Sequence, residues 1–329
     1  MKLTRREAMS RYAAFLAATP LLGAQIPPVQ ELLNTFEFEI AAQHKVSAEL
    51  FEQIAGGSRG AFDRITFRPR MMVNTTKLDL SCELFGQTLF APIIVGPTYE
   101  QKRFHPDGEI AMVRGASAAK APMVISSRSS VTVEQIAAQS KTTLWYQVYP
   151  ERDMVARAQE AVKCGCKAVC LTLGVTQEPG VDWKAIDQLR QAIGVPLLLK
   201  GILHPDEAQA AVTRGVQGIV VSNYTGRANN SAATPLEMLP AIAVAVAGKA
   251  PILIDGGFRR GSDILKALAL GASGVLLGRA ALWGLAAYGA EGVQRSIELL
   301  QTELARDMAM CGRPTLKSID ATVVKVHRL

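Results

Sequence analysis

Two glycine-rich segments near the end of the chain carry residue types that bind phosphate. The first reads Asp255-Gly-Gly-Phe-Arg-Arg-Gly261 and the second reads Gly278-Arg279. Glycine lets backbone N–H groups approach an anion closely, and the N-terminus of a following helix adds a favourable dipole. Arg259 and Arg279 can add charge-assisted hydrogen bonds. The pattern predicts a phosphate site, and the alternative is that the glycines only form tight turns between strands and helices.

A second group of polar side chains shares a position, because each one lies at or just past the end of a short apolar run. Hydroxyl and amide groups suit the polar edge of a flavin ring, and a fixed ammonium such as that of Lys200 stabilises the ring when it is reduced. No G-x-G-x-x-G segment follows a strand-like run, so a mononucleotide, FMN, is favoured over a dinucleotide. The group consists of Thr98, Ser126, Gln147, Thr172, Lys200, Ser222 and Asp255.

Eight apolar runs must position these side chains. They alternate with amphipathic stretches such as 153–164 and 205–214. Continuous hydrophobicity is typical of strands buried on both faces of a parallel sheet. Eight such units predict an α/β fold, a (β/α)8 TIM barrel with a helical N-terminal extension over 29–56, in which the strand ends meet on one face. A doubly wound sheet is the alternative. The runs are 92–96, 122–126, 144–148, 168–172, 196–200, 218–222, 251–255 and 274–278.

Composition narrows the functional class. The chain has 329 residues, a net charge of +7 and 49% hydrophobic residues, which indicates a globular protein with a large core. Its Lys and Arg residues are scattered, so we do not expect nucleic acid as a partner. No apolar run reaches the roughly 18–20 residues of a membrane span. The five cysteines form an odd number with a single C-x-C, which predicts neither a disulfide framework nor a metal site.

The first 24 residues read as a targeting segment. Arg5 and Arg6 precede an apolar stretch from Tyr12 to Leu22, and small residues follow it. This order predicts a secretory signal of the twin-arginine type and therefore export to the periplasm. An amphipathic helix in a cytoplasmic protein is the alternative. Residues 25–329 are predicted to form a single FMN-binding domain.

Several segments resemble the FMN-dependent α-hydroxy-acid oxidases and dehydrogenases, a family that includes glycolate oxidase and lactate oxidase. The resemblance implies a (β/α)8 barrel that holds FMN non-covalently, usually as a homotetramer, and oxidises the CH–OH group of a small 2-hydroxy acid. The similar segments are 61–70, 105–109, 199–202, 221–223, 255–261 and 266–272. The implied flavin contacts are Pro97, Thr98, Tyr99, Ser126, Gln147, Thr172, Lys200 and Ser222. The implied phosphate contacts are Asp255, Gly256, Gly257, Arg259, Gly278 and Arg279.

The chain departs from this family where the substrate should react. The family's Ser-Asn pair is followed by a histidine base, whereas Tyr224 stands here. Gly174 replaces the aspartate that orients this base, and the loop 175–181 lacks the family's carboxylate-binding arginine. The resemblance leaves Tyr224, Arg227 and Tyr149 as the catalytic candidates.

A phenol with an ordinary pKa of about 10 is a poor base at neutral pH and serves more naturally as an acid. We therefore expect an FMN-dependent oxidoreductase with an altered substrate or reaction. The alternatives are an inactive FMN-binding protein in which Tyr224 only fills space, or a reductase or isomerase that uses Tyr224 as an acid. Tyr99 and Thr225 replace small residues of the family and narrow the space above the flavin.

Overall fold

The computed structural model of the chain describes residues 26–57, 59–174, 182–224 and 233–327. The predicted targeting segment 1–24, the loop 175–181, Thr225 and Arg227 lie outside these residues. Within the described ranges, no helix is long and apolar enough to cross a membrane.

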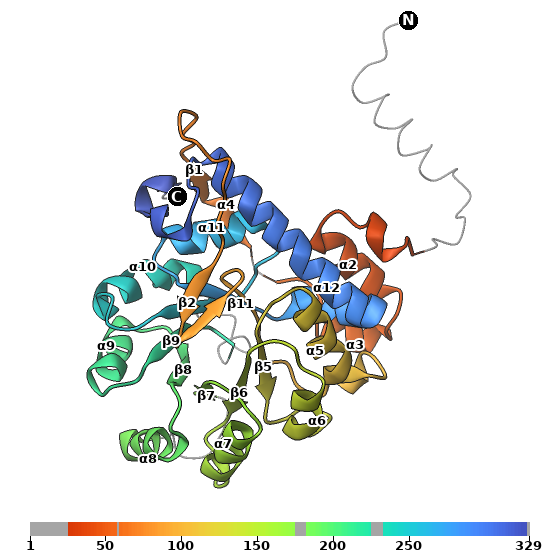
Figure 1. Cartoon of the computed structure of the whole chain (residues 1–329), viewed down its shortest axis with the longest axis vertical. Helices are drawn as coiled ribbons and strands as arrows, with labels where there is room; N and C mark the ends of the chain where they lie inside the picture. The colour runs from red at the N-terminus through yellow and green to blue at the C-terminus, as the bar shows by residue number, and fades with distance from the viewer. Residues whose placement is uncertain (1–25, 58, 175–181, 225–232, 328–329) are drawn as a thin grey trace, which may run out of the picture.

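Eight parallel strands form a closed barrel at the centre of the molecule (Figure 1). Each of the eight predicted apolar runs coincides with one of these strands, and only β8 extends past its run, by two residues. The barrel prediction is therefore confirmed, and the doubly wound alternative is wrong. The strands follow one another around the barrel in chain order, and β11 closes it by pairing with β4. They are β4 Ile93–Val95, β5 Met123–Ser126, β6 Leu144–Val148, β7 Val169–Thr172, β8 Leu197–Ile202, β9 Gly218–Val221, β10 Ile252–Asp255 and β11 Gly274–Leu277.

Helices surround the barrel, and several begin at capping residues that the sequence supplies. Asp182 caps the helix after β7 through the backbone N–H of Ala185, and Thr234 and Glu237 form a capping box after β9. The predicted stretches 153–164 and 205–214 contain α7 and α9. The helices are α5 Gly108–Ala118, α6 Val133–Ala138, α7 Met154–Lys163, α8 Trp183–Ile193, α9 Pro205–Thr213, α10 Pro235–Val246, α11 Gly261–Ala269 and α12 Arg279–Met310.

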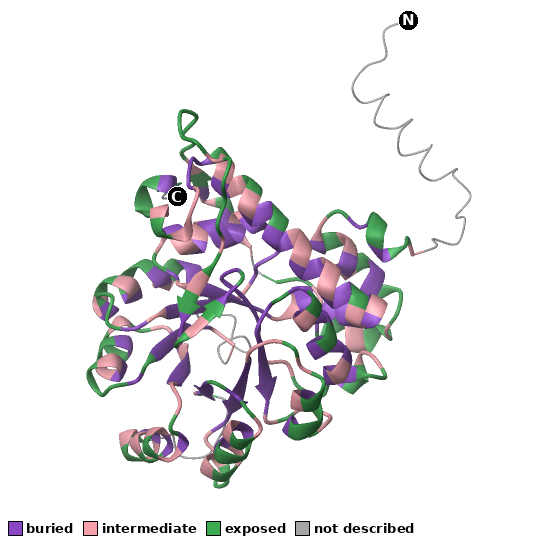
Figure 2. Ribbon diagram, viewed as in Figure 1, coloured by how far each residue is buried: buried purple, intermediate pink, exposed green. Residues whose placement is uncertain are grey.

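Alternating strand residues build two cores, and Figure 2 shows the strands as almost continuously buried. One set, which includes Ile94, Trp145 and Cys170, fills the barrel interior. The other set packs outward against the helices. Cys170 thus has the packing role expected for a cysteine inside an apolar run.

A short hairpin covers one end of the barrel. Its strands are β2 Cys82–Leu84 and β3 Gln87–Leu89. Phe85, at the turn, packs edge-to-face on Trp145 at 5.3 Å and lies against Gly218, the first residue of β9. The hairpin therefore covers the N-terminal ends of the strands and leaves the C-terminal ends to a site.

The N-terminal extension is helical, as predicted, and packs on α12 (Figure 1). It comprises η1 Val29–Glu31, α2 Thr35–Gln43, α3 Ala48–Glu52 and α4 Gly60–Asp63. The strands β1 Ile65–Phe67 and β12 Val324–Val326 pair next to it. Three further 3-10 turns complete the described elements: η2 Gln101–Arg103, η4 Leu316–Ser318 and η5 Ala321–Val323.

Candidate functional site

A pocket of about 670 Å³, open to solvent, lies at the C-terminal ends of the barrel strands. It brings together most of the predicted site residues, from those that follow the first barrel strand to those that follow the last. Those that line it are Pro97, Thr98, Gln147, Tyr149, Lys200, Tyr224, Asp255, Gly256, Gly257, Arg259, Gly278 and Arg279. Gly96, Phe258, Leu276 and Leu277 also line it and were not predicted; as apolar or small residues inside strands or loops, they carry no chemical signal in the sequence.

Lys200 is held in place at the end of β8 by the two neighbouring strands. Its Nζ donates to Ser222 Oγ and pairs with Asp255 Oδ2, both at 2.7 Å. Ser222 in turn donates to Asp255 Oδ2 at 2.9 Å. The lysine side chain is 4% exposed, so its charge has a fixed position in a poorly solvated place.

Asp255 retains one carboxylate oxygen for a ligand. Its Oδ1 atom is buried and has no hydrogen-bond partner among the described residues. A buried acceptor without a donor is costly, and a ligand hydroxyl in the pocket would satisfy it. The carboxylate is unsuited to contact a phosphate directly, because the two charges repel.

Gln147 lines the pocket, whereas Ser126, Thr172 and Tyr99 do not. Gln147 Nε2 donates to Thr172 Oγ1, which fixes the orientation of the amide. Ser126 is buried and pairs in register with Gln147. Tyr99 is 40% exposed at the rim, so it does not fill the interior of the pocket.

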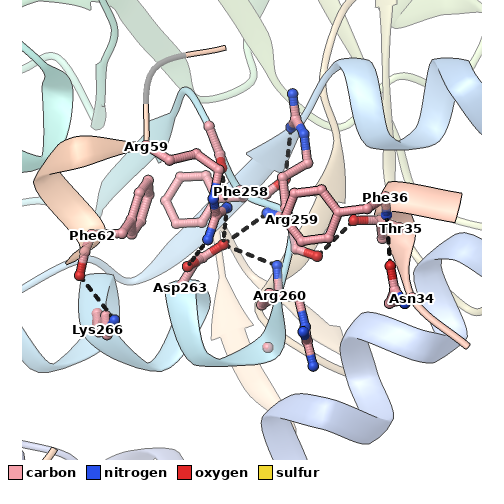
Figure 3. Close-up of polar contacts among 12 residues, drawn as sticks. Asn34, Thr35, Phe36, Arg59, Phe62, Phe258, Arg259, Arg260, Asp263 and Lys266 are labelled. Carbon is pink, nitrogen blue, oxygen red and sulfur yellow. Dashed lines mark hydrogen bonds and ion pairs between the residues drawn. The ribbon is translucent and has the colours of Figure 1, made fainter. Parts of the chain in front are cut away.

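The loop that follows β10 is organised by Asp263, in the first turn of α11. Its Oδ2 atom accepts the backbone N–H groups of Arg259 and Arg260, each at 2.9 Å (Figure 3). Arg59 adds hydrogen bonds at 2.6 and 3.0 Å to the two carboxylate oxygens. A protein carboxylate therefore occupies the N-terminus of α11. The backbone N–H groups of Arg259 and Arg260 are therefore already paired within the protein.

The N-terminus of α12 is open by comparison. Gly278 precedes it without a capping side chain, and no atom lies within 4 Å of where a Cβ would be. Arg279 and Arg259 flank it and donate to the carbonyls of Ala55 and Gly56 at 3.2 and 3.1 Å. Burial and the neighbouring Arg279 charge lower the pKa of Arg259. An open helix N-terminus between two arginines fits a phosphate dianion.

Three tyrosines and one arginine form the outer part of the site. The Lys200 Nζ atom lies 5.3 Å from the ring centroid of Tyr224. Burial raises the pKa of Tyr149 to about 12, and the nearby phenol of Tyr224 adds to this effect. Arg128 lies 4.0 Å over the ring of Tyr149. Arg128 was not predicted, although it comes two residues after Ser126 and follows a strand end like the residues that were.

The pocket thus combines an open helix N-terminus between two arginines, a carboxylate oxygen without a donor and a fixed ammonium, which together fit FMN. Comparisons with known proteins agree. The sequence profile of the family described as FMN-dependent dehydrogenase matches residues 48–177 and 173–326. The two matches overlap at residues 173–177, directly after β7.

Individual relatives cover almost the whole chain. A peroxisomal (S)-2-hydroxyacid oxidase of Arabidopsis thaliana is 33% identical over 91% of this chain and 98% of its own length. An L-lactate oxidase of a Nostoc species is 35% identical over 88% and 97%. The crystal structure of a mandelate oxidase with (S)-2-phenylpropionate superposes with a TM-score of 0.85 at 34% identity, covering 91% of this chain and all of that one.

Proposed function

The chain belongs to the FMN-dependent dehydrogenase family, and we propose that Tyr224 gives this member an altered substrate or reaction. It is an oxidoreductase of the 2-hydroxy-acid class, and its cofactor is FMN. The observation that carries the proposal is the complete cofactor end of the pocket beside a tyrosine where the family resemblance implies a histidine base.

The residues of the pocket divide into two tasks. Gly278, Arg279 and Arg259 would hold the FMN phosphate, and Asp255 Oδ1 would accept a hydroxyl from the chain that links phosphate and ring. When bound, FMN supplies the two-electron acceptor for a hydrogen on the substrate carbon. Lys200, fixed by Ser222 and Asp255, supplies positive charge beside that acceptor.

Tyr224 and Tyr149 would handle the substrate. The Tyr149 phenol stays protonated far above neutral pH, because burial raises its pKa to about 12. It therefore acts as a hydrogen-bond donor to a substrate oxygen. Tyr224 would donate a hydrogen bond from its Oη atom to a substrate oxygen, because a phenol is a poor base at neutral pH. The proton that the substrate hydroxyl loses on oxidation would pass to water, since the pocket is open to solvent.

Anaerobic reduction tests the proposal. The purified protein should be yellow, and at least one 2-hydroxy acid from a broad panel should bleach it in the absence of oxygen. The variant Tyr224→Phe should then lose roughly 10²–10³-fold in the rate of reduction, because it removes a hydrogen-bond donor to the reacting oxygen. Combining Tyr224→His with Gly174→Asp should raise turnover of common 2-hydroxy acids.

Two outcomes would assign a different function. A flavin that no 2-hydroxy acid reduces in the parent protein, but that is reduced after Tyr224→His with Gly174→Asp, would identify an inactive FMN-binding protein. Wild-type rates in Tyr224→Phe would remove the proposed role of the phenol.

We also propose a homo-oligomer. Leu33 and Ile40, on the N-terminal extension, are 70% and 57% exposed. Met71 and Met72, in the loop before β2, are 85% and 100% exposed. Exposed apolar side chains on a folded surface are typical of interfaces. Light scattering of the purified FMN-loaded protein tests this, and a monomeric mass would contradict it.

Export is the third part of the proposal. It is supported by the order of basic, apolar and small residues over 1–24. Replacing both Arg5 and Arg6 by lysine should retain the protein in the cytoplasm if a twin-arginine route operates. Unchanged fractionation of that variant would contradict this route.

A further inference from the structure

We propose that Arg128 is a specificity-determining residue that binds the carboxylate of an anionic substrate and that Glu151 competes for it when the site is free of substrate. This inference rests on the proposed function, because it assigns the substrate class of the same pocket.

The position of Arg128 connects it to the pocket wall. It lies in the loop after β5, and its guanidinium carbon is 4.0 Å from the ring centroid of Tyr149. Tyr149 is 3% exposed and lines the pocket. The Arg128 charge also interacts with Tyr224, which lines the pocket too. Arg128 is therefore a cation close to two of the tyrosines that line the pocket.

Backbone contacts keep Arg128 at this rim. Its N–H donates to Ser126 Oγ at 3.2 Å, and its carbonyl accepts the N–H of Glu100 at 3.1 Å. Glu100 follows Tyr99, so these bonds tie the loops after β4 and β5 together. The guanidinium is therefore presented from a constrained loop, which lowers the entropic cost of using it for binding.

Glu151 leaves much of the guanidinium available. Arg128 Nη2 donates to Glu151 Oε1 at 2.7 Å, and the two side chains are 43% and 32% exposed. A half-exposed pair of this kind is weak, whereas a guanidinium has five donors and binds carboxylates in pairs. A substrate carboxylate near Tyr149 could thus displace Glu151 from Arg128, or share the guanidinium with it, at a small cost in free energy.

The other cations that line the pocket already have partners away from Tyr149. Lys200 is paired with Asp255, and Arg259 and Arg279 lie at the phosphate end beside Gly56 and Ala55. The other end of the pocket is lined by Tyr149 and Tyr224. Among the described residues there, Arg128 is the arginine that contacts a lining side chain, the ring of Tyr149. Arg128 is therefore suited to favour binding of a negatively charged substrate over a neutral one.

The test uses FMN-loaded protein and two pairs of non-reacting probes: pyruvate with pyruvamide, and phenylglyoxylate with its amide. Dissociation constants come from the change in flavin absorbance on titration. Arg128→Met should weaken binding of the acids about ten- to hundredfold, because it removes a charge-assisted contact. Arg128→Lys should recover part of this loss. Neither variant should change binding of the neutral amides.

Glu151→Gln gives the sharper distinction. It should tighten binding of the acids about two- to fivefold, since it removes the competing carboxylate. A merely structural ion pair predicts weaker binding in both variants and for acids and amides alike. Arg190→Met serves as a matched control, because Arg190 forms a similar partly exposed pair with Asp187 on α8. It should leave all four dissociation constants unchanged.

Three results would overturn the inference: acid binding that is insensitive to Arg128→Met, equal weakening by Arg128→Met and Glu151→Gln, or a wild-type protein that binds neither acid. The proposed function fails separately, when no 2-hydroxy acid reduces the bound flavin. If both hold, Arg128→Met should raise KM for the 2-hydroxy acid tenfold or more with kcat changed less than about threefold.

Discussion

In the proposed function, Arg259 and Arg279 hold the FMN phosphate, so they should distinguish a flavin that carries a phosphate from one that does not. Arg259→Met keeps an apolar side chain over Trp283, which the guanidinium contacts at 4.2 Å. It should weaken FMN binding at least tenfold, because a charge-assisted contact contributes about 1.5–3 kcal/mol. Riboflavin binding should not change. Isothermal titration of the apoprotein with both flavins measures this difference.

Arg260→Met provides the control for that experiment. Arg260 is the next residue, but its guanidinium pairs with Glu303 at 2.9 Å instead of facing the pocket. It should leave the ratio of FMN to riboflavin affinity as in the wild type. A parallel loss of both flavins in Arg259→Met would mean that the arginine acts on loop structure and not on the phosphate.

The buried phenols of Tyr146 and Tyr149 should lose their protons at a higher pH than exposed tyrosines in an alkaline titration. Burial raises the pKa of Tyr146 and of Tyr149 to about 12, against about 10 in an unfolded chain. In the folded state both phenols stay protonated at pH values above the pKa of a phenol in the unfolded chain. The stability they contribute is complete below pH 10 and is lost as the pH rises from 10 to 12.

Absorbance at 295 nm and urea unfolding at several pH values measure this effect. The free energy of unfolding should fall between pH 10 and 12, and the fall should be smaller in Tyr149→Phe and in Tyr146→Phe. Tyrosine absorbance that is complete by pH 11 in the folded protein would show that these phenols are solvated.

At the scale of elements, Asp263 joins the N-terminal extension to the loop after β10. It is 1% exposed, pairs with Arg59, and accepts the N–H groups of Arg259 and Arg260. Thr35 of α2 adds a hydrogen bond to the Arg259 carbonyl at 2.6 Å. Asp263→Ala should lower the free energy of unfolding by about 3–5 kcal/mol, because it leaves a partly buried charge unpaired.

A double-mutant cycle checks the coupling. Arg59→Met with Asp263→Ala should cost clearly less than the sum of the single variants, with an interaction energy of about 1–3 kcal/mol. Urea denaturation of the four proteins supplies the values. Additive losses would show that the extension and the loop are held independently.

The same elements show what could be predicted from sequence. Strands such as Pro196-Leu-Leu-Leu-Lys200 combine a continuous apolar run with a terminal charge, so the barrel and the converging site residues were predictable. The role of Asp263 was not, because its partner Arg59 lies 204 residues away. The hairpin around Phe85 was also missed, since its strands have three residues each and depend on contact with Trp145.

At the scale of the whole molecule, the two ends of the barrel have different tasks. The β2–β3 hairpin packs into the N-terminal end, where Phe85, Leu84 and Leu89 join the interior core. At the C-terminal end, polar side chains line a pocket, and two of the lining arginines donate to the carbonyls of Ala55 and Gly56. Apolar packing stabilises one end without help, whereas the other contains like charges and an unsatisfied carboxylate oxygen that a ligand must satisfy.

FMN should therefore stabilise the molecule unevenly. With free FMN at one hundred times its dissociation constant, the free energy of unfolding should rise by about 2.7 kcal/mol. Hydrogen exchange should slow most in 54–57 and 255–260, because FMN phosphate bound by Arg259 and Arg279 would relieve the repulsion between them. Exchange in the hairpin 82–89 should change little in the same titration. Uniform protection of both ends would instead show that the barrel responds to the ligand as one unit, and that the hairpin end is not independently stable.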